Sequence, residues 1–236
     1  TSGSTGFSKG VMLPARSMWS NIEFGREKLG KCLKAGDSIV SMLPMAHMYG
    51  LAFEFLYEFC YGCHIYFLTR MPSPKIILQA FADVKPKIVV AVPLIIEKII
   101  KKNVLPKLET PTMKFLMHVP LVNDKIKAKI REQLMSAFGG EFYQIIVGGA
   151  AFNQEIEAFL RSINFPYTVG YGMTECGPII SYEDWVNFKA GSCGKSAPRM
   201  ETKILSVDPQ NVPGEIVTRG DNVMLGYYKN EEATAV

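Results

Sequence analysis

Residues 1–10 read TSGSTGFSKG and combine three glycines, five hydroxyl side chains and one lysine in a single run. Glycines let backbone N–H groups curve around an anion without interference from a Cβ atom. Serine and threonine hydroxyls add hydrogen-bond donors, and the Lys9 ammonium supplies a positive charge. A helix predicted to begin near Ala15 would point its positive end at the same anion. The run therefore predicts a phosphate-binding loop made by Thr1, Ser2, Gly3, Ser4, Thr5, Gly6 and Lys9.

The spacing within this run excludes two common nucleotide loops. A Walker A loop requires a glycine, four residues and then Gly-Lys-Ser/Thr, whereas Lys9 is preceded by Ser8 and followed by Gly10. The dinucleotide fingerprint GxGxxG places one residue between its first two glycines, and two residues separate Gly3 from Gly6. On this stretch alone, a flexible Gly/Ser linker stays open as the alternative.

The composition is that of a globular protein with a sizeable core. The 236 residues are 48% hydrophobic and 20% charged, which fits one or two domains. The net charge of +4 is mild and not gathered in one block, so we expect no nucleic-acid partner. No apolar run reaches the ~18 residues of a membrane span, and no signal peptide is evident. Five scattered cysteines favour reduced thiols and a cytoplasmic location.

The order of the predicted elements indicates an α/β fold. Apolar, β-branched runs bounded by turn residues alternate with segments of helical periodicity through most of the chain. We expect helices over 15–32, 51–61, 75–84, 94–108, 121–138 and 153–163, and strands over 38–43, 64–68, 87–92, 142–147 and 166–170. Beyond residue 191 the helical period stops, and 200–207 and 214–219 are typical of antiparallel strands. The sequence thus predicts a mainly parallel sheet with flanking helices in residues 1–188, followed by the start of an antiparallel β-barrel subdomain in residues 189–236.

Two further segments follow predicted strands, where ligands bind in parallel α/β sheets. Residues 171–175 (YGMTE) offer an aromatic face, a hydroxyl and a carboxylate suited to a hard cation. Residues 148–150 (GGA) are small enough for a flat ring to approach the backbone. An ordinary loop with one glutamate, and glycines that only pack a helix against a strand, are the plainer alternatives.

Together these segments resemble the signatures of the adenylate-forming superfamily, which comprises acyl-CoA synthetases, luciferases and peptide-synthetase adenylation domains. Residues 1–10 are similar to its loop Ser/Thr-Gly-Thr/Ser-Thr-Gly-x-Pro-Lys-Gly, with Ser8 where the family usually has proline. Residues 171–175 match Tyr-Gly-x-Thr-Glu, and residues 148–150 match Gly-Gly-Ala. The resemblance implies catalytic roles for Lys9, Thr174 and Glu175. It further implies that Thr174 contacts the α-phosphate, that Glu175 holds Mg²⁺, and that adenine lies between Tyr171 and a wall of Gly148, Gly149 and Ala150. Gly172 belongs to the same cofactor-binding set.

The segment 43–50 (LPMAHMYG) follows another predicted strand and contains one histidine. A lone histidine in an apolar segment is more often a core residue than a catalyst. The segment nevertheless resembles the family's Pro-x-x-His-x-x-Gly motif near the acyl channel. We therefore expect His47, Tyr49 and Gly50 to bind the substrate. His47 would shape the channel and would not act as a base, because a carboxylate substrate is already a nucleophile.

Residues 213–220 (PGEIVTRG) and 223–230 (VMLGYYKN) resemble the β-barrel subdomain of the same family. A plain antiparallel hairpin is the alternative, and we expect a structural rather than a catalytic role here. Residues 60–64 (CYGCH) satisfy the pattern of c-type haem attachment, but haem c requires export, so we interpret the match as chance.

The resemblance implies ATP- and Mg²⁺-dependent activation of a carboxylic acid to acyl-AMP, followed by thioester formation with coenzyme A. Aromatic residues between Tyr49 and Phe67 favour an apolar tail and hence a fatty acid. A luciferase-like or peptide-synthetase adenylation domain, and a non-catalytic nucleotide-binding module, stay open. No obligatory protein partner is evident, and peripheral membrane contact of the full-length protein stays open. Because the chain begins inside a functional loop, we expect it to be the central part of a longer ligase and to be inactive alone.

Overall fold

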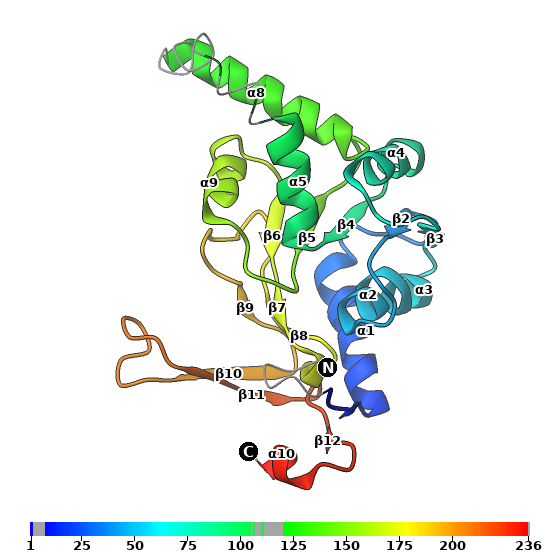
Figure 1. The fold of residues 1–236 in the computed structure, drawn as a ribbon, viewed down its shortest axis with the longest axis vertical. Helices are drawn as coiled ribbons and strands as arrows, with labels where there is room; N and C mark the ends of the chain where they lie inside the picture. The colour runs from blue at the N-terminus through cyan, green and yellow to red at the C-terminus, as the bar shows by residue number, and fades with distance from the viewer. Residues whose placement is uncertain (2–7, 105, 107–109, 111–119, 236) are drawn as a thin grey trace.

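The computed structural model describes residue 1, residues 8–104, residues 106 and 110, and residues 120–235. The predicted phosphate-loop residues Ser2, Gly3, Ser4, Thr5 and Gly6 lie outside the described residues. Figure 1 shows the chain as a body of helices and strands from which one long hairpin projects. Among the described residues, no helix is both long and apolar enough to cross a membrane.

A three-stranded parallel sheet forms the centre of the body. It has the order β4 (Ile88–Ala91), β5 (Gln144–Val147) and β6 (Tyr167–Val169), with Ile88 opposite Gln144 and Ile145 opposite Tyr167. A second parallel pair, β2 (Ser38–Ser41) and β3 (His64–Phe67), lies beside β4. The runs 87–92 and 142–147 were predicted as buried strands, and β4 and β5 are buried along their whole length, as is typical of strands covered on both faces.

The two faces of the sheet contact two separate hydrophobic clusters. Val89 and Ala91 of β4 point into one cluster, whereas Ile88 and Val90 point into the other, as the two-residue period of a strand requires. The first cluster lies under α4 (Pro74–Val84), α5 (Pro93–Asn103), α8 (Pro120–Ala137) and α9 (Gln154–Ser162). The second lies under α1 (Ala15–Leu29) and a helical run made of α2 (Met48–Leu51), the π-helical turn η1 (Ala52–Leu56) and α3 (Tyr57–Tyr61). The α/β prediction is therefore confirmed.

Local sequence signals explain where several helices begin and end. The Asn153 side chain accepts hydrogen bonds from the backbone N–H groups of Glu155 and Ile156, so it caps α9 as predicted. Ser73 caps α4 in the same way, ahead of Pro74 at its first position. The CYGCH residues 60–64 fall where α3 ends and β3 begins.

Antiparallel pairing begins earlier than the predicted change near residue 191. β7 (Tyr171–Gly172), β8 (Ile179–Tyr182) and β9 (Lys195–Ser196) form one antiparallel sheet, interrupted by the 3₁₀ turn η2 (Thr174–Cys176). β10 (Met200–Leu205) and β11 (Glu215–Gly220) form the projecting hairpin. β1 (Val11–Met12) pairs with β12 (Gly226–Tyr227), ahead of α10 (Glu231–Ala235).

The described residues contain no closed barrel, so the predicted β-barrel subdomain is not confirmed. Residues 200–220 form two strands of extended hairpin, with most side chains exposed on both faces. The domain boundary near residue 189 stays a prediction.

Candidate active site

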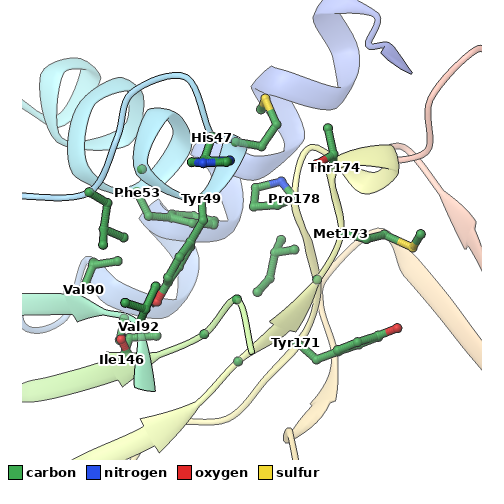
Figure 2. A pocket seen from close by; sticks show the side chains of 18 of the residues that line it. His47, Tyr49, Phe53, Val90, Val92, Ile146, Tyr171, Met173, Thr174 and Pro178 are labelled. Carbon is green, nitrogen blue, oxygen red and sulfur yellow. Dashed lines mark hydrogen bonds between the residues drawn. The ribbon is translucent and has the colours of Figure 1, made fainter. Parts of the chain in front are cut away.

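A cavity of ≈ 630 Å³ opens at the carboxyl ends of the parallel strands. Residues that follow β2, β4, β5 and β6 all line it, as expected for a ligand site in a parallel α/β sheet. Figure 2 shows Tyr49, Val92 and Ile146 on one side of this space and Tyr171, Met173 and Thr174 on the other. Segments far apart in the sequence therefore meet at one edge of the sheet.

Most of the predicted site residues that the structure describes line this cavity. They are Thr1, Lys9, His47, Tyr49, Gly50, Gly148, Gly149, Tyr171, Gly172, Thr174 and Glu175. Ala150 is exposed and lies outside the lining, so only two residues of the predicted GGA wall face the cavity.

The part of the cavity lined by Lys9, Thr174 and Glu175 is its polar end. The Glu175 carboxylate accepts a hydrogen bond there from a residue that no sequence motif marked as functional. The Tyr227 hydroxyl donates a 2.8 Å hydrogen bond to Oε1 of Glu175. The Lys9 ammonium lies 4.7 Å from the centroid of the same tyrosine ring. Burial and the bond to Glu175 raise the pKa of Tyr227 to about 12, so its hydroxyl remains a donor at neutral pH.

Backbone and amide hydrogen bonds hold the segment that carries Glu175. The Glu175 carbonyl accepts from the backbone N–H of Met224 at 2.8 Å. Asn21 of α1 accepts from the Ile179 N–H at 3.0 Å, and Asn222 donates to the Ile179 carbonyl at 2.7 Å. Both asparagines are fully buried. Helix α1 and the segment before β12 therefore both hold Ile179, four residues after Glu175.

Beyond the polar end, the cavity extends into the second hydrophobic cluster. This apolar arm is lined by Phe24, Leu29, Leu43, Phe53, Val90, Ile146, Ile179 and Tyr182. The Phe24 ring makes edge contacts with Phe53 and Tyr182, at centroid distances of 5.7 and 5.4 Å. The arm is therefore suited to an apolar group and not to a charged one.

Tyr49 lines the cavity next to the apolar arm, with its ring centroid 6.4 Å from that of Phe53. Its hydroxyl donates to the Ile146 carbonyl at 3.0 Å, and burial raises the pKa of Tyr49, so the hydroxyl is neutral. A Cβ atom on Gly148 would lie 3.0 Å from Cζ of Tyr49, so any larger residue here would require the Tyr49 ring to shift. The flat ring packed on Gly148 is thus that of Tyr49, whereas the sequence predicted adenine beside the glycines.

His47 lies at the exposed rim of the cavity, ahead of helix α2. Figure 2 shows His47 among the labelled residues that line the cavity, together with Phe53, Tyr49 and Pro178. A buried carboxyl group fixes the backbone before it. Oε2 of Glu54 accepts from the N–H groups of Met42 and Leu43 at 2.9 and 2.7 Å.

Glu54 is fully buried in the π-helical turn, and burial raises its pKa to about 8. The only sequence signal for this role is a glutamate inside the apolar run LAFEFLYEF. For Tyr227 the signal was weaker still, because the segment 223–230 was expected to be structural only.

The donor chemistry of the polar end fits a magnesium–nucleotide complex. Mg²⁺ prefers oxygen ligands and is usually held by one or two carboxylates together with substrate phosphates. Glu175 supplies a carboxylate, Thr174 supplies a hydroxyl, and the Lys9 ammonium can pair with phosphate. The described parts of the chain contain no cluster of three or more His, Cys, Asp or Glu side chains that could hold a metal alone. Phosphate oxygens and water would complete the coordination.

Comparisons with known proteins point to the same chemistry. The chain is 27% identical to long-chain-fatty-acid–CoA ligase 1 of Saccharomyces cerevisiae, over 100% of this chain and 37% of that protein. It is 30% identical to 4-coumarate–CoA ligase 1 of Oryza sativa subsp. japonica, over 99% of this chain and 39% of that protein. The chain thus spans about two fifths of the length of these curated relatives.

A solved structure shares the fold. O-succinylbenzoate coenzyme A synthetase from Bacillus subtilis, in complex with ATP and magnesium ion, matches with a TM-score of 0.72 and 23% identity. That match covers 100% of this chain and 43% of the other. The family described as AMP-binding enzyme matches residues 1–228. The chain therefore belongs to the AMP-binding enzyme family, the adenylate-forming enzymes that its motifs resemble.

Proposed function

We propose that the protein containing this chain activates a carboxylic acid with ATP to an acyl-adenylate and then transfers the acyl group to coenzyme A. One observation carries the proposal: Lys9, Thr174 and Glu175 line one end of a cavity whose other end is an apolar arm. A charged nucleotide and an apolar acid could therefore meet in one space. The curated relatives, named as CoA ligases of long-chain fatty acids and of 4-coumarate, support the same reaction class.

The residues have separate roles in this reaction. Glu175 would hold Mg²⁺, which would neutralise negative charge on the phosphates. Lys9 would pair with the phosphates and favour departure of pyrophosphate, and the Thr174 hydroxyl would donate to an α-phosphate oxygen. The substrate carboxylate then attacks the α-phosphorus in line with the leaving pyrophosphate, without a protein base. Enclosure of the acid in the apolar arm orients its carboxylate.

We propose a fatty acid as the substrate, because the apolar arm offers aliphatic and aromatic side chains without a charged group. A linear alkyl tail needs no hydrogen-bond partner along the arm. An aromatic acid of the 4-coumarate kind also carries an apolar body, but its hydroxyl would have to find a polar partner there.

The test is ATP–pyrophosphate exchange by the full-length protein against a panel of fatty, aromatic and amino acids, with Lys9→Ala as the control. Exchange driven by fatty acids, and lost in the control, supports the proposal. Exchange driven by amino acids would indicate a peptide-synthetase type, and ATP binding without exchange would indicate a non-catalytic module. Coenzyme A as acceptor is tested separately by thioester formation. The inactivity of the 236-residue chain alone stays a prediction for the same assay.

A further inference from the structure

Tyr227 contacts both charged side chains of the polar end. Its hydroxyl donates to Oε1 of Glu175 at 2.8 Å, and its ring carries the Lys9 ammonium 4.7 Å from its centroid. One neutral side chain is thus shared between an anion and a cation. Among the described residues, neither Lys9 nor Glu175 forms an ion pair within 4.0 Å.

Backbone pairing, and not contact with Lys9 or Glu175, sets the position of Tyr227. Strand β12 pairs with β1, which places Tyr227 opposite Val11, two residues after Lys9. The Tyr227 N–H donates to the Thr234 hydroxyl at 2.9 Å, and the next N–H donates to the Gly10 carbonyl at 2.7 Å. The ring is therefore held in place before any ligand binds.

The arrangement has an electrostatic consequence. A lysine and a glutamate at one end of a partly enclosed cavity attract each other, and a direct ion pair would occupy both groups. A phosphate or a metal ion would then have to break that pair before it could bind. The Tyr227 hydroxyl contacts only one oxygen of Glu175, and its ring face is a weaker partner for Lys9 than an opposite charge, so Mg²⁺ and phosphate can bind while Tyr227 stays in place.

We propose that Tyr227 is a positioning residue that keeps Lys9 and Glu175 apart and so leaves both free to bind the magnesium–nucleotide complex. This inference rests on the proposed function, because it assumes that Mg²⁺ and ATP bind at this end of the cavity. The plain alternative is that Tyr227 only packs β12 against β1. In that case its removal would lower stability without changing how binding depends on magnesium.

The experiment measures binding of α,β-methylene-ATP to the full-length protein by calorimetry, with Mg²⁺ and with EDTA. Tyr227→Leu removes ring and hydroxyl, whereas Tyr227→Phe keeps the ring. The neighbouring Tyr228 provides matched controls, Tyr228→Leu and Tyr228→Phe, because its side chain is exposed and lies outside the cavity lining. Thermal unfolding reports whether each variant is folded.

We expect Tyr227→Leu to weaken binding with Mg²⁺ at least about tenfold, since the freed charges can pair. Its binding in EDTA should weaken too, because Lys9 is affected. Tyr227→Phe should weaken binding about threefold, with Mg²⁺ only, because only the contact with Glu175 is lost. The two Tyr228 variants should bind as the unmodified protein does.

A double-mutant cycle tests whether the hydroxyl acts through the carboxylate. If it does, Tyr227→Phe adds nothing in a Glu175→Gln background. Additive effects, or unchanged magnesium-dependent binding in a folded Tyr227→Phe protein, would overturn the proposal while leaving the proposed function intact. If the unmodified protein binds no magnesium–nucleotide complex, the proposed function fails and this inference fails with it. Because the conservative variant changes one oxygen atom, the test does not depend on Tyr227→Leu folding.

Discussion

At the polar end of the cavity, Lys9, Glu175 and Tyr227 come from three distant parts of the chain, and Tyr227 contacts the other two. In the apolar arm, by contrast, residues such as Phe24 and Phe53 also belong to the hydrophobic core that holds the sheet and helices together. Each charge at the polar end thus comes from a single side chain, whereas many side chains together determine the shape of the apolar arm. We expect substitutions at the polar end to affect all substrates strongly, and substitutions around the arm to affect substrates unequally.

The largest expected effect is that of Glu175→Gln in the full-length protein. The change keeps the shape of the side chain but removes the charge that would hold Mg²⁺. Adenylation should fall at least about 100-fold for every acid, measured by pyrophosphate exchange. Glu215→Gln, on the exposed hairpin, is the matched control. Activity within a few-fold of the unmodified protein would remove Glu175 from the mechanism.

The two regions also differ in how far the sequence revealed them. The strands β4, β5 and β6 were located to within two residues at each end, because buried parallel strands are continuous apolar runs bounded by prolines and glycines. The motif residues of the polar end were found because their types suit phosphate and magnesium. Strands of two residues, such as β1 and β12, carry no periodicity, and their pairing joins opposite ends of the chain.

Contacts between segments that are far apart in the sequence also explain which site residues the sequence did not predict. Tyr227 and Glu175 are 52 positions apart in the sequence. Their contact depends on the pairing of β1 with β12, which no sequence pattern predicts. Glu54 is a charge in an apolar run, but its partners are backbone groups that no side-chain pattern marks. The adenine wall at Gly148 and Gly149 stays a prediction, and the sequence did not indicate that the Tyr49 ring packs on Gly148.

The second prediction concerns carboxyl groups behind the apolar arm. Glu54 and Glu58 are 0% and 1% exposed, and burial raises the pKa of each to about 8 from an ordinary 4.5. Between these values the folded protein binds more protons than the unfolded chain. The stability that these groups contribute is therefore complete below pH 4.5 and is lost as pH rises through 8. Each tenfold difference in proton affinity between the folded and unfolded chain corresponds to about 1.4 kcal/mol of folding free energy.

Urea unfolding of this chain between about pH 5 and pH 8.5 measures the effect. The free energy of unfolding should decrease toward the alkaline side, and the double variant Glu54→Gln, Glu58→Gln should flatten this part of the curve. A curve of the same slope in the double variant would show that other groups cause the pH dependence.

The third prediction tests the rim of the arm. His47→Ala in the full-length protein should change the preference between short and long acids by up to about tenfold, chiefly through KM. The rate of pyrophosphate exchange at saturation should change less, because His47 takes no part in the chemistry. His64→Ala, at an exposed position at the start of β3, is the control. A uniform loss of kcat for every acid would instead assign His47 a chemical role.

The smallest expected effect is that of Tyr49→Phe, which probes the cavity wall next to the apolar arm. The ring that packs on Gly148 remains, and only the hydroxyl that donates to the Ile146 carbonyl is lost. One hydrogen bond to that carbonyl is lost, so the free energy of unfolding should fall by about 1 kcal/mol relative to the unmodified chain. Tyr66→Phe, on the half-exposed edge of β3, is the matched control and should be close to neutral. Because the shape of the wall is kept, acid preference in the full-length protein should stay within about threefold. A larger shift in preference would mean that the hydroxyl itself contacts the substrate. The apolar arm would then begin deeper in the cavity than Tyr49.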